Sequence, residues 1–409
     1  MAPVNARAKE WQRSSAIAVF LFAVVTLGIA YATTAGQGHD FFDSYGYQQV
    51  FIRLIEEGQY RPSRFYGHPL AELIIGFLSY FFGSAMTDSV TYVAFVGSVA
   101  FFFRACFPRV SFFSDWRFIG LTAMCVSNPV LFFNNTIPMD FSWALLFLSI
   151  GLYFLSRGRF ELSCLAFGLA IACRANFALF AYTLILSYAY VRRATTKCER
   201  TITLLALTSF CGGVFYLTVF FQSHLSLSFI SNSGGPELTL GQLMPRFTYK
   251  LWEAFGVFSF FIVLWGSIEL FRLRGGTRTE RSVLLSVGPL VLVNLGVFFG
   301  MPTKLAILEP AIVATYVLLS SLNRKWLFIG VFVLNMGSWF VSFDLLDIQY
   351  RYSDPCKEVQ AVSVRLSPHF TAGEYYKTRE RAKYIWCVSG AFGDRKEAYE
   401  AGRPLRRRS

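Results

Sequence analysis

The chain has 409 residues, of which 54% are hydrophobic, 18% aromatic and only 15% charged. Because soluble domains carry about 25% charged residues, this composition excludes an ordinary soluble protein and favours one embedded in a membrane. The net charge of +13 does not indicate nucleic-acid binding, since the basic residues fall in short clusters between apolar runs. We expect these clusters to be cytoplasmic loops of a membrane protein.

The first apolar run covers about residues 15–35 and follows a basic N-terminus. It is longer than the roughly 7–15 apolar residues of a signal peptide, and further apolar runs come after it. We therefore interpret it as a retained membrane helix whose basic end lies in the cytoplasm.

The next segment, residues 36–88, is predicted to be a long structured loop on the outer side. Apolar residues at helical spacing, beginning at Tyr47, predict an amphipathic helix at the membrane surface. The run HPLAELIIGFLSYFFG (68–83) could be read as a span. Because it opens with His-Pro, contains Glu72 and is short, we expect a juxtamembrane helix in the interface instead.

The sidedness of the whole chain depends on that interpretation. With 68–83 in the interface, the cytoplasmic loops hold 18 Lys or Arg, and the outer loops before the C-terminal segment hold six. Counting 68–83 as a span would turn most basic clusters outward, against the positive-inside rule. The expected fold is an all-α polytopic membrane protein of about eleven spans, with its N-terminus inside and its C-terminus outside. The predicted spans lie near 15–35, 89–107, 118–133, 141–156, 161–174, 177–191, 201–222, 251–271, 282–300, 305–321 and 326–343.

Three regions are expected along the chain: a transmembrane domain (1–343), a small extracytoplasmic segment (344–393) and a basic tail (394–409). Of the eight cysteines, only Cys356 and Cys387 fall in the extracytoplasmic segment. An outside compartment is oxidising, so these two cysteines are candidates for a disulfide, with two free thiols as the alternative.

Polar residues gather at one predicted face of the membrane. Taken singly, each of these residues is typical of the polar residues found at helix boundaries. Together, however, separate outer loops deliver acids and bases to the same depth on the same side, which indicates a functional site. The residues are His39, Asp40, Asp43, His68, Asp140 and Lys304.

The order of short motifs around these residues resembles the GT-C glycosyltransferases, polytopic enzymes that use polyprenyl-phosphate-linked sugars. They include the protein O-mannosyltransferases and the lipid A aminoarabinose transferases. The stretch DSYGY, from Asp43, resembles the family's Asp-acid-x-x-Tyr motif, with Ser44 in place of the second acid. His68-Pro69-Leu70 resembles its His-Pro-Pro-Leu, with one Pro missing. NPVLFFNNTIPMDFSWALLFL, FGLAIACRANFAL and KLAILEPAIVA are similar to later elements, so the resemblance covers roughly residues 15–320.

The resemblance implies a GT-C-like bundle that transfers a sugar, with inversion, from undecaprenyl or decaprenyl phosphate to a lipid, glycan or protein acceptor. The reaction would take place at the outer face of a bacterial inner membrane. By motif position Asp43 is the expected general base, and Asp140 would orient the acceptor or support a cation. The expected substrate-binding residues are Asp40, Tyr47, Arg64, His68, Arg174 and Lys304, the last two as phosphate holders with Arg64 as a third candidate.

Simpler roles stay open for several of these residues. Asp43 could only cap a helix, Arg174 could be a snorkelling arginine, and His68 could cap the juxtamembrane helix. The histidines show no zinc signature, and use of Mg²⁺ or Mn²⁺ is left open.

Two other classes of function are alternatives for this sequence. A transporter or flippase for a lipid-linked or anionic small molecule is the main alternative, and it should place charges deep in several spans or show broken helices in matched halves. A non-catalytic membrane scaffold does not explain the long structured first outer loop.

Overall fold

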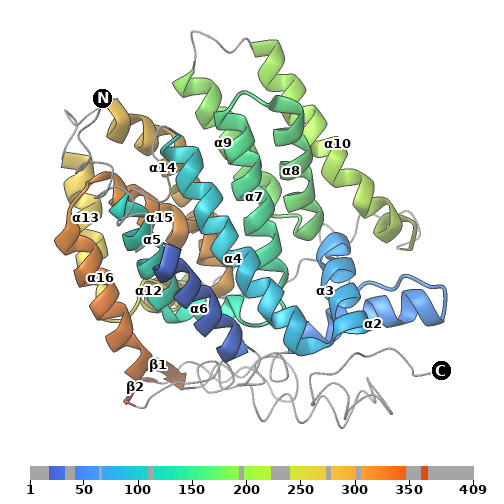
Figure 1. The fold of residues 1–409 in the computed structure, drawn as a ribbon, viewed down its shortest axis with the longest axis horizontal. Helices are drawn as coiled ribbons and strands as arrows, with labels where there is room; N and C mark the ends of the chain where they lie inside the picture. Colours follow the sequence, from blue (N-terminus) through green and yellow to red (C-terminus); the bar gives the residue numbers. More distant parts are fainter. Residues whose placement is uncertain are drawn as a thin grey trace.

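A computed structural model of the chain describes residues 18–32, 42–63, 67–108, 115–192, 198–222, 240–272, 278–300, 305–346 and 361–366. These residues form a bundle of helices with one small sheet at its edge (Figure 1). The elements are the helix Ala18–Ala32, α2 (Phe42–Glu56), α3 (Pro69–Phe82), α4 (Ser84–Cys106), α5 (Trp116–Ser127), α6 (Pro129–Asn135), α7 (Asp140–Ser156), α8 (Phe160–Cys173), α9 (Phe177–Val191), α10 (Cys198–Gln222), α12 (Leu240–Ala254), α13 (Ser259–Arg272), α14 (Arg278–Gly300), η2 (Leu305–Leu308), α15 (Glu309–Ser321), α16 (Lys325–Gly337), η3 (Ser338–Phe340), β1 (Val341–Leu346) and β2 (Ala361–Leu366).

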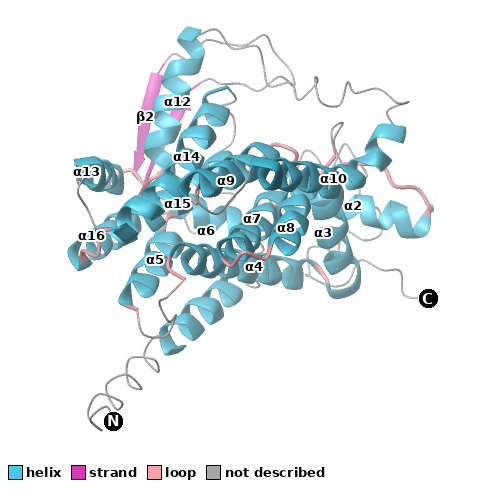
Figure 2. Ribbon diagram, turned by 90° about the horizontal axis from the view of Figure 1, so that it is seen from above, coloured by secondary structure: helices cyan, strands magenta, loops and turns pink. Residues whose placement is uncertain are grey.

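Two helices form the centre of the bundle. All of the residues of α15 are buried, and this helix contacts α14, α5 and α13. Helix α7 packs against α4, α8 and α9, and its buried residues include Phe141, Leu145 and Leu148. Figure 2 shows α7 and α15 with other helices on both sides. A helix that is apolar all round has to be covered on every side, which explains their position.

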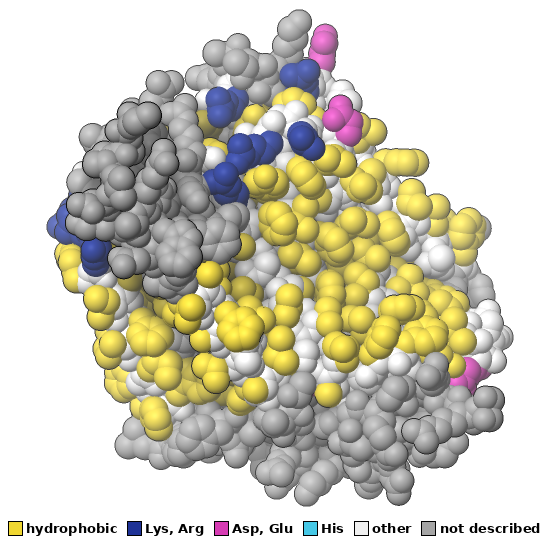
Figure 3. Space-filling model, in the orientation of Figure 1, with side chains coloured by type: hydrophobic (Ala, Val, Ile, Leu, Met, Phe, Trp, Pro, Cys, Tyr) yellow, Lys and Arg dark blue, Asp and Glu magenta, His cyan; other side chains and the backbone are white. Residues whose placement is uncertain are grey.

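Within the described residues, three helices, α4, α10 and α14, are long and apolar enough to cross a membrane. The number rises to five if each of two bent helix pairs counts as one span. Large apolar side chains are exposed along α10, among them Phe210 (69%) and Phe221 (65%). Figure 3 shows a wide yellow band of exposed apolar side chains, with the dark blue Lys and Arg side chains mainly above it. Exposed apolar surface on this scale is that of a membrane-embedded protein.

Helical segments lie at all eleven expected span positions, but the number of eleven spans stays a prediction because most of these helices are short. Two expected spans are not straight helices. The run 118–133 bends by 77° between α5 and α6, where Pro129 begins the second helix. The expected span 251–271 was wrong as a single helix: α12 ends at Ala254, Gly256 takes a positive φ, and α13 leaves at 89°.

The described part of the chain is almost entirely helical, as expected, apart from one strand pair. Strands β1 and β2 form an antiparallel pair in which Val341 faces Leu366. The expected span 326–343 therefore ends early, with α16 stopping at Gly337. The sequences VSFDLL and AVSVRL alternate apolar with polar or small residues, which is the two-residue period of a strand.

Both helices expected in the first outer loop are present. Helix α3 begins at Pro69, which is well suited to the first helical turn, and α2 packs against it through Phe51 and Phe77. The placement of α3 in the interface stays a prediction. The expectation that Asp43 is the N-cap of α2 was wrong, because the helix already begins at Phe42; Asp43 lies in its first turn.

Candidate functional site

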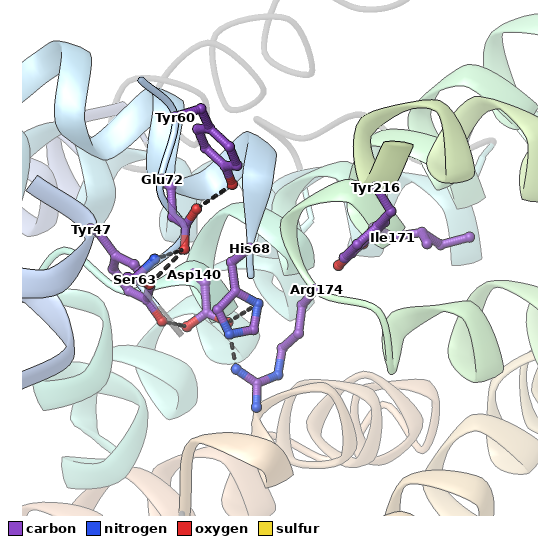
Figure 4. A network of polar contacts seen from close by, with 9 residues as sticks. All are labelled: Tyr47, Tyr60, Ser63, His68, Glu72, Asp140, Ile171, Arg174 and Tyr216. Carbon is purple, nitrogen blue, oxygen red and sulfur yellow. Dashed lines mark hydrogen bonds and ion pairs between the residues drawn. The ribbon is translucent and has the colours of Figure 1, made fainter. Parts of the chain in front are cut away.

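The carboxylate of Asp140 is the centre of a buried polar cluster (Figure 4). Tyr47 Oη donates a hydrogen bond to Asp140 Oδ1 at 2.8 Å, and Arg174 Nη1 donates to Asp140 Oδ2 at 2.5 Å. His68 Nδ1 lies 3.6 Å from the same Oδ2. Asp140 and Tyr47 are both fully buried (0% exposed). Residues separated by more than a hundred positions thus meet at one carboxylate.

Asp140 is held at the start of α7. Met139 before it has extended backbone, so the chain enters the helix with Asp140 as the first helical residue. A carboxylate in the first turn interacts favourably with the helix dipole, worth about 0.3–1 kcal/mol at a surface. That gain is small beside the several kcal/mol needed to bury a charge, so Tyr47 and Arg174 are required to stabilise Asp140.

Arg174 follows directly after α8, where the backbone becomes extended. Its guanidinium lies over the ring of Phe141, 3.7 Å from the ring centre, and is ion-paired with Asp140. Tyr216 of α10 donates a hydrogen bond at 3.1 Å to the carbonyl of Ile171, which fixes the end of α8 next to the site (Figure 4). The alternative of a snorkelling Arg174 was wrong, because this side chain is only 8% exposed and points to a buried carboxylate.

His68 lies at the junction between the first loop and α3. It occupies the N-cap position, but its side chain makes no capping hydrogen bond. Its ring instead faces Asp140 and packs edge-to-face on Tyr47 with 5.9 Å between ring centres. The alternative that His68 caps the juxtamembrane helix through its side chain was therefore wrong.

A second carboxylate, that of Glu72, organises the loop between α2 and α3. Tyr60 Oη donates to Glu72 Oε2 at 2.5 Å, while the backbone N–H and the hydroxyl of Ser63 both donate to Oε1. Burial raises the pKa of Glu72 above its ordinary range, against the opposing effect of these hydrogen bonds. Burial, and then the charge of Glu72, raise the pKa of Tyr60 as well, so Tyr60 stays a hydrogen-bond donor.

A third carboxylate reaches the cluster from α15. Glu309 is the first residue of that helix, is fully buried, and lies close enough to Asp140 and Arg174 for their charges to act on it. Asn135 Nδ2 donates to Glu309 Oε2 at 3.4 Å. The site thus holds the carboxylate of Asp140 beside one guanidinium, with the carboxyl groups of Glu72 and Glu309 near enough to act electrostatically on the cluster.

Four of the residues singled out from the sequence, Tyr47, His68, Asp140 and Arg174, come together in this cluster. For Asp43 the structure describes the backbone in α2 but not the side chain. The other predicted residues lie outside the described part of the chain: His39, Asp40, Arg64, Lys304, Cys356 and Cys387.

Sequence reasoning missed the parts played by Glu309, Asn135 and Tyr60. Glu309 had a usable signal, because an acidic residue that opens an apolar run is costly in a membrane protein and so points to function. Asn135 and Tyr60 gave no usable sequence signal, since amides and tyrosines are common at helix ends and in interfacial loops. In the described residues no three His, Cys, Asp or Glu side chains come close enough to hold a metal ion.

Comparisons of the chain with family models, with curated proteins and with solved structures found no match.

Proposed function

We propose that the protein is a membrane glycosyltransferase that takes a sugar from a polyprenyl-phosphate donor and transfers it, with inversion, to a lipid, glycan or protein acceptor on the extracytoplasmic face. The observation that carries the proposal is the buried cluster of Tyr47, His68, Asp140 and Arg174. These residues come from four segments of the chain and meet where helices begin or end. Buried charges in a membrane protein are costly and mark functional sites.

The reaction breaks the bond between the sugar C1 and the phosphate oxygen, and forms a bond between C1 and the acceptor oxygen. The proton of the acceptor hydroxyl passes to a carboxylate, and the polyprenyl phosphate leaves with the bonding electrons. The departing phosphate needs a fixed cation. Arg174 supplies one, because its guanidinium is held by Asp140 and by the Phe141 ring and still has further N–H groups to donate.

The contacts of Asp140 favour a positioning role for this residue. Both of its oxygens already accept hydrogen bonds, one from Tyr47 and one from Arg174, and an ion-paired carboxylate is a weak base. Asp43, four residues before Tyr47 on α2, stays the proposed general base. In this account Asp140 orients Arg174 toward the phosphate, and Asp43 takes the proton.

The proposed sidedness has support from the arrangement of the helices. Asp140, Arg174 and Phe177 lie at one end of α7, α8 and α9, while the exposed Arg157 and Arg159 lie at the opposite end, in the turn between α7 and α8. Basic loops mark the cytoplasmic side, so the cluster belongs to the outer side of what we propose is a bacterial inner membrane.

Cysteine labelling tests this orientation. In intact cells a membrane-impermeant thiol reagent should label Gln59→Cys and leave Glu161→Cys unlabelled until the membrane is permeabilised. Both positions are exposed in the structure, so access to the thiol depends only on the side of the membrane. Labelling of Glu161→Cys from outside would reverse the topology and refute the extracytoplasmic site.

The activity itself is tested with purified full-length protein and a panel of polyprenyl-phosphate sugars. We expect release of free polyprenyl phosphate from at least one donor, measured by chromatography of the lipid products. Failure to release polyprenyl phosphate from any donor, with or without Mg²⁺ or Mn²⁺ and with added membrane acceptors, would refute the proposal.

A transporter or flippase is the second candidate, because two helix pairs are bent by 77° and 89° and broken helices are typical of transporters. In transporters, however, such breaks bind the substrate or ion. Here uncharged side chains at the breaks are hydrogen-bonded to one another, for example Asn335 with Ser259, and one buried acid, Glu253, lies at the end of α12. The charged side chains of the cluster lie elsewhere, which favours the enzyme.

A further inference from the structure

Glu309 and Asn135 leave two buried acceptor atoms beside the Asp140 cluster. Glu309 Oε1 and Asn135 Oδ1 are both buried and make no hydrogen bond of normal length among the described residues, although the side chain of Asn134 also acts on the Glu309 carboxyl group. The contact that joins the two side chains, from Asn135 Nδ2 to Glu309 Oε2, is long at 3.4 Å. A buried acceptor without a donor costs about 1–3 kcal/mol, and more if it is charged.

The backbone around Glu309 is held rigidly. Asn294 of α14 donates to the carbonyl of Ile307 at 2.9 Å and accepts from the N–H of Ala311 at 3.2 Å. These two bonds hold the backbone on either side of Glu309. A carboxylate kept in place by a dedicated amide clamp is preorganised in the way that binding sites require.

A purely structural role does not account for Glu309. Its position in the first turn of α15 lets it interact with the helix dipole, which is worth at most about 2 kcal/mol. Burying the charge costs several kcal/mol, and Asp140 nearby carries a charge of the same sign. A structural residue at this place would gain more by being apolar, like most of the other buried residues of α15.

We propose that Glu309 and Asn135 form the subsite that binds hydroxyl groups of the transferred sugar ring. This inference rests on the proposed glycosyltransferase function and adds the group that recognises the sugar. Two acceptor atoms suit two O–H donors, and Asn135 stands five residues before Asp140, which holds the Arg174 guanidinium assigned to the phosphate. The subsite determines which sugars are accepted. A polyprenyl-phosphate sugar that lacks a bound hydroxyl leaves a buried hydrogen-bond acceptor of the protein unpaired.

The test uses purified full-length protein, the polyprenyl-phosphate sugar that the wild type cleaves fastest, and monodeoxy analogues of that donor. Release of polyprenyl phosphate gives kcat/KM for each. We expect the wild type to disfavour one or two of the deoxy donors by roughly 100-fold or more. Glu309→Ala should lower kcat/KM for the parent donor and reduce the penalty for one deoxy position at least about tenfold, and Asn135→Ser should relax the same or a neighbouring position.

Asn335→Ser is the matched control, because Asn335 is also a fully buried Asn but belongs to a hydrogen-bonded group of neutral side chains. It should leave the ranking of the deoxy donors unchanged. A thermal unfolding measurement separates binding from packing: glutamine keeps the shape and the acceptor oxygen of Glu309 without burying a charge, so Glu309→Gln should be at least as stable as the wild type.

The outcomes are distinct. Unchanged preferences in both Glu309→Ala and Asn135→Ser, or a large loss of stability in Glu309→Gln, would overturn the subsite and leave the proposed function standing. A wild type that cleaves no donor would overturn the proposed function and the subsite with it.

Discussion

The molecule contains two groups of buried polar side chains that differ in charge and in hydrogen bonding. The charged cluster comprises Tyr47, His68, Asp140 and Arg174, with Glu72 and Glu309 beside them. The neutral cluster comprises Asn128, Ser259, Tyr316 and Asn335, which lie where α5 meets α6 and where α12 meets α13.

In the neutral cluster every amide atom of the two asparagines has a partner. Asn335 Nδ2 donates to the carbonyl of Met124 at 3.0 Å, and its Oδ1 accepts from Ser259. Asn128 donates to the carbonyl of Ala254 at 2.9 Å and accepts from the N–H of Leu131 at 3.0 Å. These bonds satisfy backbone groups that the two helix breaks leave open, which is a structural task.

In the charged cluster, by contrast, not every buried polar atom makes a hydrogen bond to a described residue. Its arginine is paired with Asp140, the carboxyl groups of Glu72 and Glu309 act electrostatically on the cluster, and Glu309 Oε1 makes no hydrogen bond among the described residues. Incompletely satisfied buried charge destabilises a fold and is retained at sites that bind something. We therefore propose that the neutral cluster serves packing and that the charged cluster serves the proposed reaction.

The largest effect should follow from Asp43→Asn. Asparagine keeps the shape and the polarity of aspartate but cannot take a proton, so turnover should fall roughly 100- to 10,000-fold while stability stays near that of the wild type. The fall in turnover is measured as the rate of polyprenyl phosphate release at a saturating concentration of the sugar donor. Asp40→Asn is the neighbour control, and a dead Asp40→Asn beside an active Asp43→Asn would move the base to Asp40.

Arg174→Lys should lower kcat by roughly 100-fold. Lysine keeps the positive charge but lacks the planar fork that bonds to Asp140 while presenting other N–H groups to phosphate. Turnover against donor concentration, together with the thermal midpoint in detergent, measures both effects. A Lys variant as active as the wild type would show that charge alone is needed at this place.

Asn335→Ala should change stability and leave activity alone. It leaves the carbonyl of Met124 and the hydroxyl of Ser259 without their amide partner, at a cost of about 1–3 kcal/mol. Thermal unfolding in detergent should show a lowered midpoint, and turnover per folded molecule should stay within about twofold of the wild type. Loss of turnover without loss of stability would refute the structural assignment of the neutral cluster.

The smallest effect is a pH dependence at Glu72. The pKa of Glu72 is higher in the folded protein than in the unfolded chain, where it is about 4.3. The contribution of Glu72 to the free energy of unfolding is therefore fully present below about pH 4.3 and is lost as the pH rises through the pKa of the folded state. Glu72→Gln mimics the protonated form. The thermal midpoint of the wild type relative to Glu72→Gln should therefore fall between pH 4 and pH 8, and a constant difference would contradict the raised pKa.

The sequence predicted the helical membrane class, because apolar length and basic loops are local signals. It predicted His68 and Asp140 at one face of the membrane and singled out Tyr47 and Arg174 as substrate-binding residues, and the structure brings these four together. The sequence did not predict the break at Gly256 or the strand pair after α16. A single glycine in an apolar run does not reveal its φ angle, and strand pairing depends on a partner twenty residues away.

Glu309 and Asn135 show a further limit of sequence reasoning. Each lies at the end of a helix, where a polar residue is ordinary. Only the packing of α15 into the centre of the bundle makes Glu309 fully buried and brings it beside Asp140. Tertiary contacts of this kind, between residues 174 positions apart in the case of Asn135 and Glu309, have no local signature.

The central claim is that the charged cluster performs the reaction and the neutral cluster holds the fold. Single-turnover release of polyprenyl phosphate by Asp140→Asn and by Asn335→Ala, each compared with the wild type at equal amounts of folded protein, tests it most directly. We predict a rate roughly 100-fold or more below the wild type for Asp140→Asn, because Arg174 loses its charged partner, and a rate near that of the wild type for Asn335→Ala. Equal rates for the two variants would contradict the account.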